Sequence, residues 1–150
     1  MRLLTKSNYL LVITFFVVGC ASTISFFDQF SYKETISAKI EALALMDKAV
    51  EDYDSQKESI ESVVKAMNKV YEYEKNRPKN TETTKMWEIL LDPNKNLFGG
   101  FLKKWETDKK ENQTFIDQAK PQVEKAFDII IDLENKKIKP EGVSKFINNN

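Results

Sequence analysis

The amino-acid sequence predicts an all-α protein, an elongated antiparallel helical hairpin or bundle in which a short crossover helix joins two long helices. Three observations predict this fold class. Apolar residues recur with heptad spacing in two long segments of the chain. Only four glycines and four prolines occur among 150 residues, whereas a β-sandwich needs turn residues every ~8–12 positions. Hydrophobic residues make up 41% of the chain but concentrate near its N-terminus, and the lean remainder favours thin helical packing.

The first long helix is expected over residues 34–75, a segment without glycine or proline. At 1.5 Å per residue, such a helix is ~60 Å long. Lys39 and Glu74 occupy frayed ends of one apolar column, and Lys57 interrupts the other. The two columns consist of Ile36, Leu43, Val50, Lys57, Val64 and Tyr71, and of Met46, Tyr53, Ile60 and Met67.

The segment "DYDSQKES" is the candidate for a break in this helix, because Asp54 and Ser55 are residues that start helices. The heptad register continues across it, so we expect a single helix with a local bend. If the two long helices pair antiparallel with Tyr71 opposite Leu102, Lys57 lies near Ile116 and about one turn from Asn112. These residues would form a polar layer in the middle of the helical seam.

The crossover and the second long helix follow from the prolines and caps. Pro78 ends the first helix, and a short helix capped by Asn80 or Thr81 presents an apolar face. The second long helix is expected from about residue 100 to 133. Pro121 lies inside it, where proline costs ~3 kcal/mol and bends the axis, so we expect a kink or a restarted helix there. A short helical turn over residues 143–147 is expected to dock on the bundle.

The N-terminal segment "MRLLTKSNYLLVITFFVVGC" has the pattern of a secretory leader. Arg2 and Lys6 form a basic region, residues 9–18 form an apolar run, and the small residue Gly19 follows. The segment ends in Cys20, which is the only cysteine of the chain. The pattern predicts export across a membrane.

The last four residues of this segment, "VVGC", resemble the lipobox of bacterial lipoprotein precursors. The resemblance implies that Val17, Val18 and Gly19 form the recognition triplet and that a peptidase cuts before Cys20. It also implies covalent diacylglyceryl and N-acyl groups on Cys20, with palmitate as a typical chain. Two or three acyl chains hold a protein stably in a bilayer, at ~0.8 kcal/mol per buried methylene.

This resemblance implies three parts of the chain: a lipoprotein signal peptide over 1–19, a lipid-anchored tether over 20–33 and a helical domain over 34–150. It implies a lipid-anchored protein of the cell membrane, in the outer membrane if the host is Gram-negative, because Ala21 rather than aspartate follows Cys20. Two other interpretations stay open. Residues 9–27 have about the ~20-residue length of an uncleaved membrane helix, and Cys20 is then an ordinary buried thiol.

The composition excludes several classes of function. The chain has no histidine and a single cysteine, which excludes intrachain disulfides, Cys/His zinc sites and catalytic dyads or triads that need an imidazole. The 23 basic and 23 acidic side chains balance and intermix, so no basic footprint for nucleic acid is present. No cofactor beyond the acyl groups is expected, and we expect the protein not to be an enzyme.

One motif imitates a calcium-binding loop. In "DPNKNLFGGFLKK", Asp92, Asn94 and Asn96 match the first ligand positions of an EF-hand. Leu97 and Lys103 stand where that loop requires glycine and glutamate. We therefore expect no metal site, and interpret the segment as a turn stabilised by its Asx side chains. Gly99 and Gly100 are expected at a helix junction where backbones approach closely.

Two aromatic clusters allow both a structural and a functional interpretation. The crossover cluster either caps an open end of the hairpin or stays partly exposed as a contact surface for a partner, formed by Trp87, Leu91, Phe98, Phe101 and Trp105. Phe26, Phe27 and Phe30, in "SFFDQF", either lie at the lipid interface or pack on the end of the bundle near the membrane.

The sequence as a whole predicts a lipid-anchored, non-enzymatic helical protein of the cell envelope. It would attach to the membrane through its lipid anchor and present a helical surface to an envelope protein whose identity the sequence does not give. The alternative is a carrier lipoprotein that holds a small apolar ligand or lipid in a slot beneath Trp87 and Trp105.

Overall fold

The computed structural model describes residues 25–136 and 140–148. All regular elements within these residues are helical, which confirms the all-α fold class. The α-helices are α1 (Gln29–Asp47), α2 (Lys57–Lys75), α3 (Thr81–Leu91), α4 (Phe98–Asp108), α5 (Gln113–Glu134) and α6 (Pro140–Asn148), and two short 3₁₀ segments, η1 (Lys48–Val50) and η2 (Tyr53–Gln56), lie between α1 and α2.

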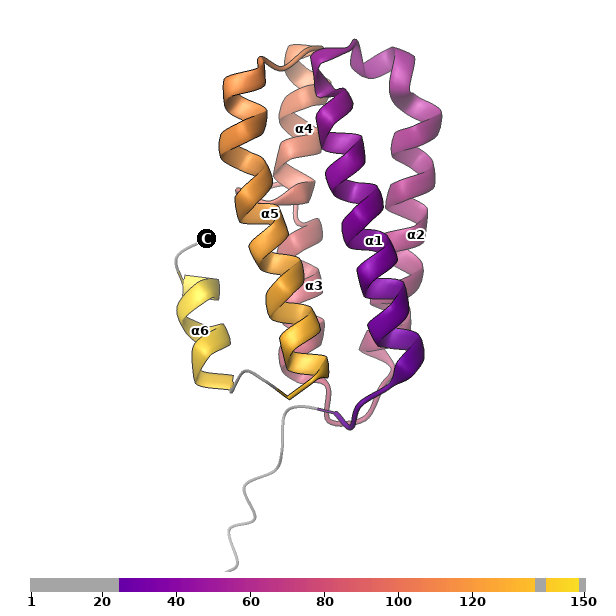
Figure 1. Cartoon of the computed structure of the whole chain (residues 1–150), viewed down its shortest axis with the longest axis vertical. Helices are drawn as coiled ribbons and strands as arrows, with labels where there is room; N and C mark the ends of the chain where they lie inside the picture. Colours follow the sequence, from indigo (N-terminus) through magenta and orange to yellow (C-terminus); the bar gives the residue numbers. More distant parts are fainter. Residues whose placement is uncertain (1–24, 137–139, 149–150) are drawn as a thin grey trace, which may run out of the picture.

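The helices form an elongated bundle of four parallel columns (Figure 1). Helices α1, α2 and α5 each form one column, and α3 and α4 stack end to end as the fourth. Helix α1 packs against both α2 and α5, and α3 packs against α5 and α2. The short helix α6 lies against α3 at the end of the bundle where α1 begins. We call this the proximal end, and the end that carries η1 and η2 the distal end.

The expected single helix over 34–75 is wrong, because the chain reverses direction at the candidate break. Helix α1 ends at Asp47, and α2 runs back beside it after η1 and η2. A carboxylate oxygen of Asp52 accepts a hydrogen bond from the Asp54 N–H at 3.0 Å and stabilises the turn. The apolar register continues because both helices turn their apolar faces to the same core. At 19 residues, α1 is about 28 Å long, half the expected length.

The predicted polar layer around Lys57 is also wrong. Lys57 is the first residue of α2, at the distal end, and its side chain is 60% exposed. It forms an ion pair with Asp54 at 2.9 Å, on the surface of the turn. The layer was inferred from a register that the reversal of the chain removes.

The second long segment is likewise two helices. Helix α4 ends at Asp108, and Lys109 takes a left-handed backbone conformation with φ of 65°. Asn112 then caps α5, its side-chain oxygen accepting a hydrogen bond from the Phe115 N–H at 2.9 Å. Pro121 lies within α5, which continues through it as one helix, so the restarted helix is wrong and the expectation that no loop forms there is confirmed.

Two further boundaries bear on the predictions. Helix α1 begins at Gln29, inside the segment 20–33 that was expected to be a tether. The short helix expected near residues 143–147 is confirmed as α6, with Val143 fully buried.

The junction between α3 and α4 depends on two glycines, as expected. A Cβ atom on Gly99 would collide with the carbonyl of Leu91, and one on Gly100 with the carbonyl of Lys95. Neither glycine has a positive φ, so close backbone approach is the reason for glycine at both positions. The loop over residues 92–97 therefore packs tightly on the first turn of α4.

Candidate functional site

The residues predicted for lipidation and signal recognition lie outside the described residues. These are Cys20, Val17, Val18 and Gly19, and their roles stay predictions. Among residues 25–136 and 140–148, none of the helices has the length and hydropathy needed to cross a membrane.

The five residues predicted as a partner contact mostly belong to the core. Trp87, Phe98 and Trp105 are fully buried, Phe101 is 3% exposed, and only Leu91 is partly exposed. Trp87 meets Phe127 edge to face, with ring centroids 5.9 Å apart. The burial contradicts an exposed aromatic surface at these positions and supports the interpretation in which the cluster packs the interior.

Trp105 has a second role at the distal end. Its indole N–H donates a hydrogen bond to the carbonyl oxygen of Glu51 at 3.0 Å, and its ring meets Tyr53 edge to face at 5.5 Å. The N–H of Tyr53 donates to the carbonyl of Lys109, and the N–H of Glu111 to the carbonyl of Ala49, both at 2.8 Å. These bonds join the loop after α1 to the loop after α4.

An exposed aromatic patch lies at the proximal end, formed by Phe26, Phe27, Phe30 and Tyr73. The three phenylalanines are 80%, 54% and 39% exposed. Phe30 and Tyr73 contact each other with ring centroids 4.6 Å apart. Large apolar side chains at such exposure are unusual on a soluble surface when they are grouped. The sequence left the placement of the phenylalanines open; Phe30 rests on Tyr73 of α2, and Phe26 and Phe27 are more than half exposed.

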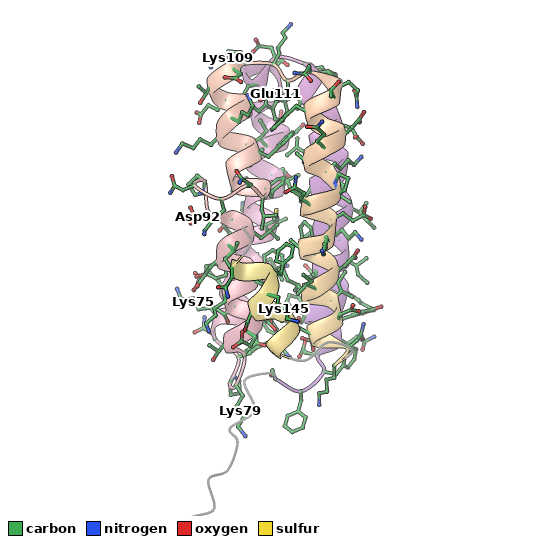
Figure 2. The ribbon with its side chains drawn as sticks, turned by 90° about the vertical axis from the view of Figure 1, so that its left-hand side faces the viewer. Lys75, Lys79, Asp92, Lys109, Glu111 and Lys145 are labelled. Atoms are coloured by element: carbon green, nitrogen blue, oxygen red, sulfur yellow. The ribbon has the colours of Figure 1, made fainter. Side chains whose placement is uncertain are left out.

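Two lysines lie over rings of this aromatic patch, and one of them, Lys69, also pairs with Glu34 at 3.4 Å. The ammonium group of Lys136 lies 4.7 Å from the ring centroid of Phe26, and that of Lys69 lies 5.4 Å from the ring centroid of Phe30. Figure 2 shows Lys79 at the same extremity of the bundle, with Lys109 and Glu111 at the opposite one. The proximal end thus combines apolar rings with cations, a pairing that suits the polar–apolar boundary of a bilayer.

A buried charge network lies immediately behind the aromatic patch. The guanidinium of Arg77, with a side chain 9% exposed, contacts a carboxylate oxygen of Glu74 at 2.9 Å and one of Glu134 at 2.7 Å. Asn80 donates to the Glu74 carboxylate at 2.5 Å, and the Ser31 hydroxyl donates to Glu134 at 3.2 Å. Burial opposes the charge of Arg77, but the hydrogen bonds to Glu134 and the neighbouring Glu74 raise its pKa, so it stays a cation.

Asp28 connects this network to the start of α1. Its backbone N–H donates to Glu134, and its side chain caps α1 by accepting a hydrogen bond from the Ser31 N–H at 2.8 Å. That bond lowers the pKa of Asp28, burial opposes the effect, and the Tyr73 hydroxyl and Arg77 lower the pKa further. Arg77 also donates to the carbonyl of Phe26 at 2.6 Å. The chain that enters the bundle is therefore fixed by hydrogen bonds on both sides of Phe27.

A groove of about 520 Å³ opens on the side of the bundle between α4, α5 and the loop over 92–97. Leu97, Phe101, Phe115 and Ala119 form its apolar floor, and lysines and amides form its rim. Figure 2 shows α6 in front of the lower half of the same side, below the level of Asp92. Neither Trp87 nor Trp105 lines the groove, so the slot expected beneath them for a carried ligand is not this cavity.

The imitation of a calcium loop is an Asx turn, as predicted. The side chain of Asp92 accepts a hydrogen bond from the Asn94 N–H at 2.8 Å. The ammonium group of Lys103 contacts the amide oxygen of Asn94 at 3.1 Å, where it would repel a cation. The described residues contain no group of three or more Asp, Glu, His or Cys side chains arranged to hold a metal ion.

The fold is an all-α helical bundle. Comparisons with known proteins do not assign the chain to a family. Searches of the chain against protein-family models, curated proteins and solved structures find no match.

Two features of the site were not predicted from the sequence. Glu74 was interpreted as a frayed end of an apolar column, but a glutamate at a core position also signals a buried charge network, and here it is fully buried. Lys39, the other frayed end, is a similar case, since it pairs with Glu124 at 3.1 Å and Asp128 at 2.6 Å across the α1–α5 contact. The groove had no sequence signal, because it depends on the separation of α4 from α5.

Proposed function

We propose that the protein is a lipid-anchored component of the cell envelope that holds a helical bundle at a membrane and presents it to a partner protein. Cys20 is the anchoring residue and carries the acyl groups. The partner is another envelope protein, and the role is non-enzymatic. In a Gram-negative host the membrane is the outer one.

The exposure of the aromatic patch is the observation that supports this proposal most. Phe26 lies six positions after Cys20, a chain length of at most about 20 Å. An anchor at Cys20 therefore keeps the proximal end near the bilayer surface, where aromatic rings and lysines are favourable. The exposure of Phe26, Phe27 and Phe30 is costly in water and becomes favourable on a membrane.

The rigid attachment of the entering chain supports the same arrangement. Asp28 and the Phe26 carbonyl are tied to Glu134 and Arg77, so the first described residues are held against the bundle. Because the entering chain is held in this way, the position of the anchor also fixes where the bundle lies. The groove between α4 and α5 then lies on the part of the bundle farther from the membrane (Figure 2) and stays accessible.

Labelling with palmitate in a bacterial host tests the anchor. The wild type should incorporate the label, migrate at the mass of residues 20–150 and fractionate with membranes. Cys20→Ser should lose all three properties. Cys20→Ser combined with Ser22→Cys is the matched control, because it keeps a thiol two positions away from the lipobox position, and it should not restore labelling.

Two results would contradict the proposal. In the first, the Cys20→Ser protein stays in the membrane at the size of the wild type, which would favour the uncleaved helix over residues 9–27. In the second, the wild type never incorporates the label.

A further inference from the structure

The fourth column of the bundle is only partly packed against its neighbour. Helix α3 packs closely along α5, whereas α4 approaches α5 at few backbone positions and contacts it through the stacked rings of Phe101 and Phe115. At the α3–α4 junction, Gly99 and Gly100 let the loop over residues 92–97 pack on the first turn of α4. The space left between α4 and α5 is the groove of about 520 Å³.

The floor of the groove is apolar and preformed. The rings of Phe101 from α4 and Phe115 from α5 lie parallel, with an interplanar angle of 3° and centroids 5.7 Å apart. Phe101 and Leu97 are fixed in the core beneath, at 3% and 1% exposure, while Phe115 and Ala119 stay partly accessible. An apolar group placed here would bury surface against side chains that do not have to move.

The rim of the groove carries an unbalanced positive charge. Lys95 and Lys103 have no carboxylate within ion-pair distance among residues 25–136 and 140–148, and Lys103 contacts only the neutral Asn94 side chain. The remaining lysine of the rim, Lys104, pairs with Asp108, the one acidic residue that lines the groove. On the α5 side the rim is formed by the amides of Gln118 and Gln122. The chemistry is complementary to an acidic ligand with an apolar centre.

Helix α6 of the chain itself covers the neighbouring part of the same side of the bundle. Helix α6 has nine residues and lies against α3, with Val143 fully buried. Phe146, three positions later, packs against the core, and the ammonium group of Lys125 from α5 lies 5.7 Å from its ring centroid. Figure 2 shows α6 between the α3–α4 column and α5, with the α4–α5 part of this side uncovered above it. A short helix of the chain itself therefore docks on this side of the bundle through apolar residues at i and i+3.

We propose that the α4–α5 groove binds a short, acidic, amphipathic helix of a partner protein. Apolar side chains of that helix lie on Phe115 and Ala119, and its carboxylates pair with Lys95 and Lys103. This inference rests on the proposed function for the idea of a protein partner, and it specifies the surface and the partner's chemistry. The α4 side of the groove, residues 97–108, is about 16 Å long, which matches a helix of two to three turns.

The alternative occupant, a single acyl chain of a carried lipid, fits the groove less well. Acyl chains bind in enclosed cavities lined by apolar side chains. This groove is partly open to solvent, and its lining includes lysines, amides and the hydroxyl of Thr107. A helix satisfies its own backbone hydrogen bonds and needs only one apolar face, so an open groove with a polar rim suits it.

A selection with a peptide library tests the inference without assuming a partner. The probe is a displayed library of helical peptides of about 14 residues, long enough to span the groove. The target is the purified full-length chain in detergent, and binders are counter-selected on Gln118→Trp, which fills the groove from its exposed rim. Enriched peptides should carry apolar residues at i, i+3 or i+4 and i+7, flanked by Asp and Glu.

The enriched peptide is then measured by fluorescence anisotropy on matched variants. Lys95→Glu combined with Lys103→Glu should weaken binding at least about tenfold, with a smaller effect at high salt. Lys65→Glu, on the exposed surface of α2, is the control and should leave the affinity unchanged. Circular dichroism checks that each variant keeps its helical content.

Three results would overturn the inference. One is that no peptide distinguishes the wild type from Gln118→Trp, and another is that the enriched peptides are basic. The third is that a fluorescent fatty acid binds the groove and the enriched peptide does not displace it, which would favour the carrier. None of these measurements depends on lipidation of Cys20, so failure of the anchor and failure of the groove are distinguishable.

Discussion

The guanidinium of Arg77 lies 2.7 Å from a carboxylate oxygen of Glu134, although 57 positions separate the two residues. This contact joins the C-terminal ends of α2 and α5. Through the backbone N–H of Asp28, which donates to the same carboxylate, it also reaches the start of α1. Three helices therefore meet at one buried ion network, at the point where the chain enters the bundle.

Removal of Arg77 should destabilise the protein strongly. Arg77→Met leaves the carboxylates of Glu74 and Glu134 buried without a cation, and we expect a loss of about 3–5 kcal/mol in the free energy of unfolding. Urea denaturation followed by circular dichroism measures the loss. Adding Glu134→Gln should recover part of it, because one buried charge is then removed.

Lys75→Met is the control, since its ion pair with Glu72 is exposed and worth at most about 1 kcal/mol. A loss below 1 kcal/mol for Arg77→Met would contradict the role of the network.

Substitutions of Asp28 should separate two contributions to stability, that of its N-cap hydrogen bond and that of its negative charge. Asp28→Ala removes the N-cap of α1 and should cost about 1 kcal/mol, whereas Asp28→Asn keeps a capping oxygen and should cost less at neutral pH. The pKa of Asp28 is lowered in the fold, so its charge contributes stability above the unfolded-state pKa, and this stability is lost as the pH falls through the lowered value. Urea titrations between pH 7 and acid should show a larger loss in the wild type than in Asp28→Asn, in which only the other carboxylates, such as Asp54, contribute. Parallel curves for the two proteins would contradict the assignment.

The contribution of Glu111, at the distal end, to the stability of the fold should change with pH in the direction opposite to that of Asp28. Burial raises the pKa of its carboxyl group, while Lys104, 3.5 Å away, opposes the rise, and one carboxylate oxygen accepts no hydrogen bond. Its contribution to stability is therefore full below the unfolded-state pKa and is lost as the pH rises through the raised value. Glu111→Gln should be at least as stable as the wild type at neutral pH, and its advantage should vanish in acid. The same denaturation series, read between pH 4 and 7, checks this; a variant that is less stable only at neutral pH would refute it.

A tryptophan at the proximal end should report contact with lipid. In vesicles that contain lipids brominated on their acyl chains, fluorescence of the lipidated Phe26→Trp protein should be quenched well beyond the wild type. Trp87 and Trp105 are fully buried and provide a constant background. Val50→Trp is the matched control, because Val50 is also exposed but lies at the distal end. Equal quenching of both variants, or none at position 26, would show that the aromatic patch does not rest on the bilayer.

Much of the fold could be predicted from the sequence, because heptad spacing and scarce turn residues report helices directly. The positions of the reversals could not. A heptad column continues through a turn when both helices face one core, as Met46 in α1 and Ile60 and Met67 in α2 illustrate. The Asx and Ser residues of "DYDSQKES" were the local signal, and they indicated the turn correctly where the longer periodicity did not.

The aromatic clusters show why exposure is harder to predict than helicity. Trp87 and Phe98, like Phe26 and Phe27, lie in segments of the sequence that are rich in aromatic residues. The first pair is nevertheless buried and the second exposed. Which cluster faces the core depends on the assembly of columns from separate helices, and no local pattern encodes it. The buried network of Arg77 was hidden for the same reason, since Glu74 and Glu134 meet only after folding.

Mass spectrometry of the intact protein, purified from membranes of a bacterial host, tests the central claim most directly. We predict a chain that begins at Cys20, with the mass of residues 20–150 increased by a diacylglyceryl group and an N-acyl chain. A protein that retains residues 1–19 and carries an unmodified Cys20 would contradict the claim.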